Sequence, residues 1–190
     1  MTKTRLEAFS DGVVAIIITI MVLELHPPED GSLHGLRELL PDFLVYLLSF
    51  VFVGIYWSNH HHLLHAATRV TGGILWANLH LLFWLSLVPF VTAWVGDFPH
   101  EPLPVAMYGV VLLMNAIAYT ILARRLMSIH GRESALAQAM DHDTKGWMSL
   151  AAYVAAVPLA FVAREIAFAL YIAVALIWLV PDRRIEKRLH

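Results

Sequence analysis

The stretch RLEAFSDGVVAIIITIMVLEL, from Arg5 to Leu25, starts with charged and polar residues and continues as an almost unbroken apolar run. An α-helix needs about 20 apolar residues to cross the ~30 Å hydrocarbon core of a bilayer. The whole chain agrees with this interpretation, because 59% of its residues are hydrophobic and only 15% are charged. A water-soluble chain of 190 residues could not hide so much apolar surface. The sequence therefore predicts an all-α membrane protein.

Charge and cysteine content exclude several functions. A formal net charge of -2 gives no basis for nucleic-acid binding. The absence of cysteine excludes disulfides, thiolate metal sites and cysteine nucleophiles. The sequence also contains no nucleophile–base set of a known enzyme class, so we expect no enzymatic activity. Because the first apolar run is long and holds acidic residues, we interpret it as a retained membrane helix and not as a cleavable signal peptide.

Six segments are apolar enough to be membrane helices. Loops rich in proline and acidic residues follow the first segment (HPPEDGS) and the third (GDFPHEPLP), and the stretch LHGLRELL predicts a short amphipathic helix on the membrane surface. Only Arg164 and Glu165 separate the last two segments, which are short and are expected to form a tight helical hairpin. The predicted helices cover residues 6–25, 41–64, 73–95, 104–126, 147–163 and 166–180 of a single domain, 1–190.

The basic residues predict the orientation of these helices. Cytoplasmic loops of membrane proteins carry an excess of lysine and arginine. With six spans, only Arg37 and Arg164 of the 13 lysines and arginines fall on the side opposite the termini. We therefore expect an even number of spans, a multi-pass protein of the cytoplasmic membrane, and both termini in the cytoplasm.

Asp11 is the most unusual residue of the first helix. An ionisable group within a membrane segment usually faces the protein interior or water and has a partner. Asp11 could pair with Arg5 or with a lysine at the inner interface and clamp two helices together, or it could bind a permeating ion directly; the clamp is the favoured interpretation. The small residues Gly12 and Ala15 would allow another helix to approach closely.

An apolar stripe continues beyond this polar end. Ile16, Ile20 and Leu23 lie on one face of the helix at i, i+4 and i+7, with Thr19 beside them. In an apolar helix such spacing by itself favours ordinary packing. The functional alternative is that the stripe lines an axis and forms a hydrophobic constriction that gates by dewetting.

Three stretches resemble a known family. Arg5 with FSDG at residues 9–12 and the apolar run ending in VLEL resembles the signature first helix of the transmembrane protein 175 family of potassium channels. YWSNHHHLL, from Tyr56 to Leu64, resembles the Trp-x-x-His pattern of the family's second helix. NLHLLFWLSLVPF, from Asn78 to Phe90, resembles its third helix. The resemblance implies six helices per chain and a homotetramer in the lipid bilayer, with a pore lined by the first helix, potassium as the permeant ion and no resident cofactor.

The resemblance also implies roles for individual residues. Ile16, Ile20 and Leu23 become apolar pore layers, with Ile16 as the constriction, and Thr19 becomes a candidate contact for a partly dehydrated cation. The sequence departs from the signature at Val14, where Phe is common in the family, and has Ile20 where Leu is also common. It contains no TVGYG motif, so potassium selectivity would have to come from side chains or be weak.

Histidines cluster at the end of the second predicted helix, where His60, His61, His62 and His65 lie. Consecutive helical residues point about 100° apart, so HHH cannot direct three imidazoles at one metal, and His61 with His65 is the better pair. We expect no metal site. The resemblance implies instead that a histidine here forms a polar network with the first helix. The signature and network residues are Arg5, Phe9, Ser10, Asp11, Gly12, Trp57, His61 and His80.

Two other functions stay open from the sequence. Histidine-ligated haem would make the protein a membrane redox protein, and a Soret band in purified protein would reveal it. A small-solute carrier would favour paired repeats and broken helices at the midplane, and the sequence shows neither. A potassium-permeable channel is therefore the expected function.

Overall fold

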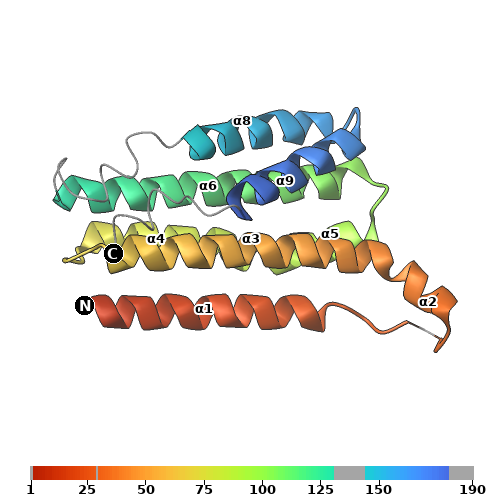
Figure 1. Ribbon diagram of the computed structural model, residues 1–190, viewed down its shortest axis with the longest axis horizontal. Helices are drawn as coiled ribbons and strands as arrows, with labels where there is room; N and C mark the ends of the chain where they lie inside the picture. The colour runs from red at the N-terminus through yellow and green to blue at the C-terminus, as the bar shows by residue number, and fades with distance from the viewer. Residues whose placement is uncertain (1, 29, 131–143, 180–190) are drawn as a thin grey trace.

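The computed structural model describes residues 2–28, 30–130 and 144–179, and these fold into a bundle of helices (Figure 1). No β-strand occurs within these ranges. The helices are α1 (Lys3–Leu23), α2 (Leu33–Glu38), α3 (Leu40–His65), α4 (Gly72–Ser86), α5 (Val88–Asp97), α6 (Pro102–His130), α8 (Thr144–Leu159) and α9 (Arg164–Leu179).

Within the described residues, four stretches are long and apolar enough to cross a membrane. They are α1, α3, the α4–α5 pair and α6. The short helix predicted from LHGLRELL is α2, and the Ser32 hydroxyl caps its start by accepting from the backbone amides of His34 and Gly35. The helices α8 and α9 also lie where the sequence predicts helices, and the structure describes 16 residues of each, which is about 24 Å of helix.

The third predicted helix is interrupted in the structure. The sequence predicts one helix over 73–95, whereas α4 ends at Ser86 and α5 begins at Val88, with Leu87 between them. Pro89 explains the break, because proline has no N–H to donate and its ring clashes with the carbonyl four residues earlier. The two parts still form one apolar stretch from Gly72 to Asp97.

The turn of the last hairpin also differs from the prediction. Arg164 and Glu165 belong to the first turn of α9 and do not form the connection. The chain turns earlier, at residues 160–163, directly after α8 ends at Leu159. Arg164 instead donates from Nη1 to the carbonyl of His100, in the loop between α5 and α6, over 2.6 Å.

The bundle places α1 at one side. It packs on α3, α4 and α5, whereas α6, α8 and α9 form the opposite side, with α9 also contacting α3 (Figure 1). The long helices alternate in direction, so the start of α1 lies at the same end as the end of α3 and the start of α4. The helix that the sequence singles out as functional is therefore covered by the protein on one side only.

Candidate pore helix and its polar anchor

One face of α1 is buried and the opposite face is largely exposed. The buried residues repeat every three or four positions along the helix: Leu6, Ser10, Val14, Ile17 and Met21. The opposite face carries Ile16, Ile20 and Leu23, whose exposed fractions are 58%, 41% and 76%. The apolar stripe predicted to line a pore is thus the face of α1 that this chain leaves uncovered.

Thr19 lies on the exposed side of α1 as well. Its hydroxyl donates to the carbonyl of Ile16 over 2.9 Å, within the same helix. This bond uses the hydroxyl proton, so the oxygen lone pairs stay available to accept or to contact a cation.

A buried hydrogen-bonded chain holds the first half of α1. The Ser10 hydroxyl donates to the carbonyl of Leu6 over 2.8 Å and accepts from Nδ2 of Asn78 over 3.0 Å. The side-chain oxygen of Asn78 in turn lies 2.6 Å from Nε2 of His60. Ser10 and Asn78 are fully buried and His60 is nearly so. Because buried polar groups are costly without partners, this chain ties α1 to α3 and α4 at one depth and one rotation.

A second contact lies beside this chain. Nε1 of Trp57 on α3 donates to the carboxylate of Asp11 over 3.0 Å. We call Ser10, Asp11, Trp57, His60 and Asn78 the polar anchor. It joins α1 to two neighbouring helices through side chains only.

The partner of Asp11 differs from the expectation. The sequence suggested Arg5 or an interfacial lysine, but within the described residues no ion pair joins Asp11 to Arg5 or to Lys3. Arg5 is six residues away, which places it about 240° around the helix. Lys3 lies two turns away and pairs instead with Glu7 at 3.8 Å, while its Nζ donates to the carbonyl of His65 over 2.7 Å. Asp11 instead contacts a second helix, α3, through the indole of Trp57.

Two predicted network residues lie outside the anchor. His80 accepts from Nε1 of Trp84 over 3.0 Å, a contact within α4. The ring of His61 lies over Trp57 with centroids 6.2 Å apart and is exposed. Their places are taken by Asn78 and His60. Periodicity could have indicated Asn78, because it shares the buried face of α4 with Ile74, and the Trp-x-x-His spacing from Trp57 leads to His60.

The remaining signature residues lie on the outer side of α1. Arg5 and Phe9 are exposed, and Gly12 has no atom of another segment within 4 Å of the place where a Cβ would stand. The close approach that Gly12 and Ala15 permit is therefore not used within this chain. Among the parts of the chain that the structure describes, no three metal-ligating side chains converge, and the pair His61 and His65 stacks at 6.2 Å.

Comparisons with known proteins agree with these features. The family model for the endosomal/lysosomal potassium channel TMEM175 matches residues 5–89, a range that holds the whole polar anchor. The chain is 54% identical over 189 residues to a potassium channel of Chryseobacterium sp. (strain P1-3), covering 100% of this chain and 98% of that protein. It is 30% identical over 149 residues to the endosomal/lysosomal proton channel TMEM175 of Gallus gallus, covering 70% of this chain and 30% of that protein.

A solved structure has the same fold. The crystal structure of a lysosomal potassium-selective channel TMEM175 homolog from Chamaesiphon minutus matches with a TM-score of 0.81 and 26% sequence identity. The match covers 94% of this chain and 96% of that one. Sequence and fold agree along nearly the whole length, and the chain therefore belongs to the TMEM175 family, whose members are membrane ion channels and not enzymes.

Proposed function

We propose that four copies of this chain form a potassium-selective channel, with α1 of each copy lining the central axis. The observation that carries the proposal is the exposed stripe of Ile16, Ile20 and Leu23 on a helix whose other face is anchored by buried hydrogen bonds. A rigidly held helix with one uncovered apolar face supplies one wall of a pore. A closed pore then needs several copies, and cyclic symmetry gives each copy the same environment.

The neighbouring copy has a place to pack. A groove between α1 and the α4–α5 break is lined by Ile17 and Ile20 on one side and by Ser86, Pro89 and Phe90 on the other. Gly12 and Ala15 have such small side chains that a helix of the next subunit can pack closely on the adjacent surface of α1. The helix break that Pro89 causes thus shapes the proposed subunit interface.

In the proposed pore, Ile16, Ile20 and Leu23 form successive apolar rings, and Ile16 is the constriction. Branched alkyl groups cannot replace the water shell of an ion, so a narrow ring of them is a dewetted barrier. Thr19, between Ile16 and Ile20, offers its hydroxyl oxygen to a partly dehydrated cation. Selectivity in this proposal comes from side chains, because no TVGYG-type backbone filter exists in the sequence.

We further propose that α8 and α9 complete six crossings of the cytoplasmic membrane, with both termini inside. The start of α1, the end of α3 and the start of α4 share one end of the bundle (Figure 1), and this end carries Lys3, Arg5 and Arg69. The excess of basic residues at that end supports a cytoplasmic location for it. The permeant ion is the proposed ligand, the bilayer is the surrounding partner, and no resident cofactor is part of the proposal.

Flux measurements on proteoliposomes test which ion permeates the channel. The names of the Chryseobacterium relative and the Chamaesiphon structure favour potassium, whereas the vertebrate relative is named a proton channel. Potassium, sodium and proton fluxes are measured on one preparation. We expect potassium flux to exceed sodium flux. Equal potassium and sodium flux would contradict selectivity, and proton flux without potassium flux would assign the channel to protons.

Assembly is tested separately by mass measurement in detergent. We expect a homotetramer. A stable monomer that still conducts after reconstitution would overturn a pore shared by four α1 helices.

A further inference from the structure

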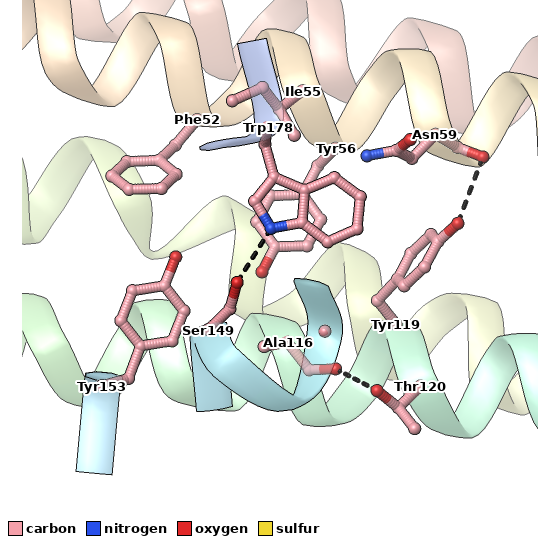
Figure 2. Close-up of a pocket in the computed structure, with 11 residues that line it drawn as sticks. Phe52, Ile55, Tyr56, Asn59, Ala116, Tyr119, Thr120, Ser149, Tyr153 and Trp178 are labelled. Atoms are coloured by element: carbon pink, nitrogen blue, oxygen red, sulfur yellow. Dashed lines mark hydrogen bonds between the residues drawn. The ribbon is translucent and has the colours of Figure 1, made fainter. Parts of the chain in front are cut away.

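The interior of the subunit offers little room for an ion. A cavity between α3, α6, α8 and α9, with Phe52, Tyr153 and Trp178 in its wall, has a volume of about 40 Å³ (Figure 2). This volume holds about one water molecule, and no charged side chain occurs among the described residues that line it. The cavity is therefore no path for a hydrated cation, which agrees with a path along the uncovered face of α1.

That face of α1 ends at a carboxylate. Glu24 directly follows α1, and its amide still donates to the carbonyl of Ile20 over 3.2 Å, so its side chain continues the helical repeat. It lines the same groove as Ile16 and Ile20. At about 1.5 Å per residue, Glu24 stands roughly 12 Å beyond Ile16 along the helix. The apolar stripe is therefore followed by a negative charge at one mouth of the proposed pore.

No contact within the subunit explains a carboxylate at this position. Glu24 is exposed, and its side chain forms no ion pair with any residue that the structure describes. The last turn of α1 also contains no basic residue. A negative charge at the C-terminal end of a helix is disfavoured, because the peptide dipoles already make that end negative. Glu24 therefore destabilises α1 slightly, and no ion pair among the described residues offsets this effect.

The end of the bundle that holds Glu24 is acidic as a whole. It also holds α2, the start of α3, the end of α5 and the starts of α6 and α9 (Figure 1). Its described residues include seven carboxylates: Glu24, Asp30, Glu38, Asp42, Asp97, Glu101 and Glu165. The described basic residues there are Arg37 and Arg164, so seven negative and two positive charges leave a formal net charge of -5, with histidine neutral. The opposite end carries Lys3 and Arg5, so the two mouths of the proposed pore differ in sign.

We propose that Glu24 of each copy contributes to an acidic ring around this mouth of the pore, and that the ring raises the rate at which cations enter. The inference rests on the proposed channel, in which α1 lines the central axis. Fixed negative charge at a pore mouth raises the local concentration of cations and lowers that of anions. The potentials of the four carboxylates add on the axis, whereas the other acidic residues of this end belong to other segments. Glu24 thus determines conductance in dilute salt, while the apolar rings determine the barrier inside.

Single-channel recording of the full-length protein in planar bilayers tests the ring. The Debye length is ~30 Å at about 10 mM KCl and ~3 Å at about 1 M KCl, so concentrated salt screens the ring. We expect the conductance of Glu24→Gln to be about threefold below the wild type in dilute salt and equal to it in concentrated salt. Glu101→Gln is the matched control, because Glu101 is an exposed acidic residue of the same end that precedes α6, on the side of the bundle opposite α1. It should conduct like the wild type at both concentrations.

Restoring the charge separates electrostatics from packing. The chain has no cysteine, so Glu24→Cys supplies a single thiol. Its thiolate attacks the sulfur of a methanethiosulfonate reagent, forms a disulfide to the reagent's ethyl group and releases methanesulfinate. The sulfonatoethyl reagent adds a negative charge and should restore the conductance in dilute salt. The trimethylammonioethyl reagent adds a positive charge to a group of similar size and should lower the conductance further.

Four results would overturn the ring. Equal conductance of Glu24→Gln and the wild type in dilute salt would mean that the carboxylate does not act on permeating cations. A reduction that persists in concentrated salt, or that both reagents change alike, would assign Glu24 to packing. An equal reduction in Glu101→Gln would assign the effect to the net charge of this end. A wild-type protein that conducts no cation at any salt concentration would contradict the proposed channel, and the ring with it.

Discussion

Nε1 of Trp57 on α3 donates a hydrogen bond to the carboxylate of Asp11 on α1, joining two residues that are 46 positions apart in the chain. This contact and the Ser10–Asn78–His60 chain lie at the same end of the bundle and fix α1 by one face. The apolar face of α1 is consequently presented away from the rest of the subunit. The orientation of the proposed pore lining is thus a consequence of polar contacts that α1 makes with α3 and α4.

Breaking the Trp57–Asp11 contact should loosen α1 more than it changes ion preference. We expect Asp11→Ala and Trp57→Phe each to lower the free energy of unfolding by about 1 kcal/mol, the usual net value of one hydrogen bond. The double variant should cost less than the sum, because both changes remove the same bond. Unfolding in mixed micelles and mass in detergent measure the effect. An intact tetramer with altered selectivity in Asp11→Ala would identify Asp11 as a direct ion site.

Asn78 should be the most sensitive residue of the polar anchor. Asn78→Leu keeps the size of the side chain but leaves Ser10 and His60 without their partner in the buried chain. Each orphaned buried group costs about 1–3 kcal/mol, so the loss in unfolding free energy should exceed that of either change at the Trp57–Asp11 contact. His80→Gln is the control, because His80 lies outside the polar anchor and accepts its hydrogen bond from Trp84 of its own helix. Equal losses in the two variants would mean that the chain through Asn78 is not the anchor.

The constriction assigned to Ile16 predicts a gain of flux on truncation. Ile16→Ala should widen the ring and raise basal potassium flux about tenfold, which corresponds to a barrier lower by about 1.4 kcal/mol. Discrimination between potassium and sodium should fall at the same time. Ile18→Ala is the matched control, since Ile18 lies about 200° around the helix and packs partly against the core. If Ile18→Ala changes both properties and Ile16→Ala neither, the pore face of α1 is wrongly assigned.

Thr19→Val tests the proposed cation contact. Valine keeps the shape of threonine but removes the oxygen that donates to the Ile16 carbonyl and faces away from the core. We expect an intact tetramer whose preference for potassium over sodium falls about fivefold, the equivalent of roughly 1 kcal/mol for one polar contact. Flux ratios from the same proteoliposome assay give the measurement. Unchanged ratios would remove Thr19 from the conduction mechanism.

Gly109 should be intolerant of any side chain. A Cβ at this position of α6 would fall on the hydroxyl of Tyr171, which donates to the carbonyl of Val105 over 3.1 Å. Gly109→Ala should therefore lower the free energy of unfolding by about 1–3 kcal/mol through overpacking between α6 and α9. Gly54→Ala is the control, because no neighbouring atom lies within 4 Å of the added Cβ; it should be neutral or slightly stabilising. A tolerated Gly109→Ala would show that α9 shifts easily.

The class of the protein and the approximate positions of its helices follow from local patterns of residues. Apolar runs of membrane length and proline-rich loops are local features, so α1, α3 and α6 lie close to the predicted ranges 6–25, 41–64 and 104–126. The grouping of Ile16, Ile20 and Leu23 on one face also follows from the helical repeat alone. These properties depend on residues near one another in the chain, and the sequence reports them directly.

Which polar groups meet depends on how the helices pack in three dimensions. The partner of Asp11 is Trp57 and not Arg5, and Ser10 meets Asn78 and His60 in place of His80 and His61, because contacts between helices depend on the rotation and depth of each helix. A rotation of about 100° exchanges one residue for the next at an interface, and apolar helices carry little in their sequence that fixes this angle. For the same reason the exposed face of α1 could not be predicted. The helical repeat places Ile16 and Ile20 on one face, but the packing of α1 on α3, α4 and α5 determines that this face is exposed.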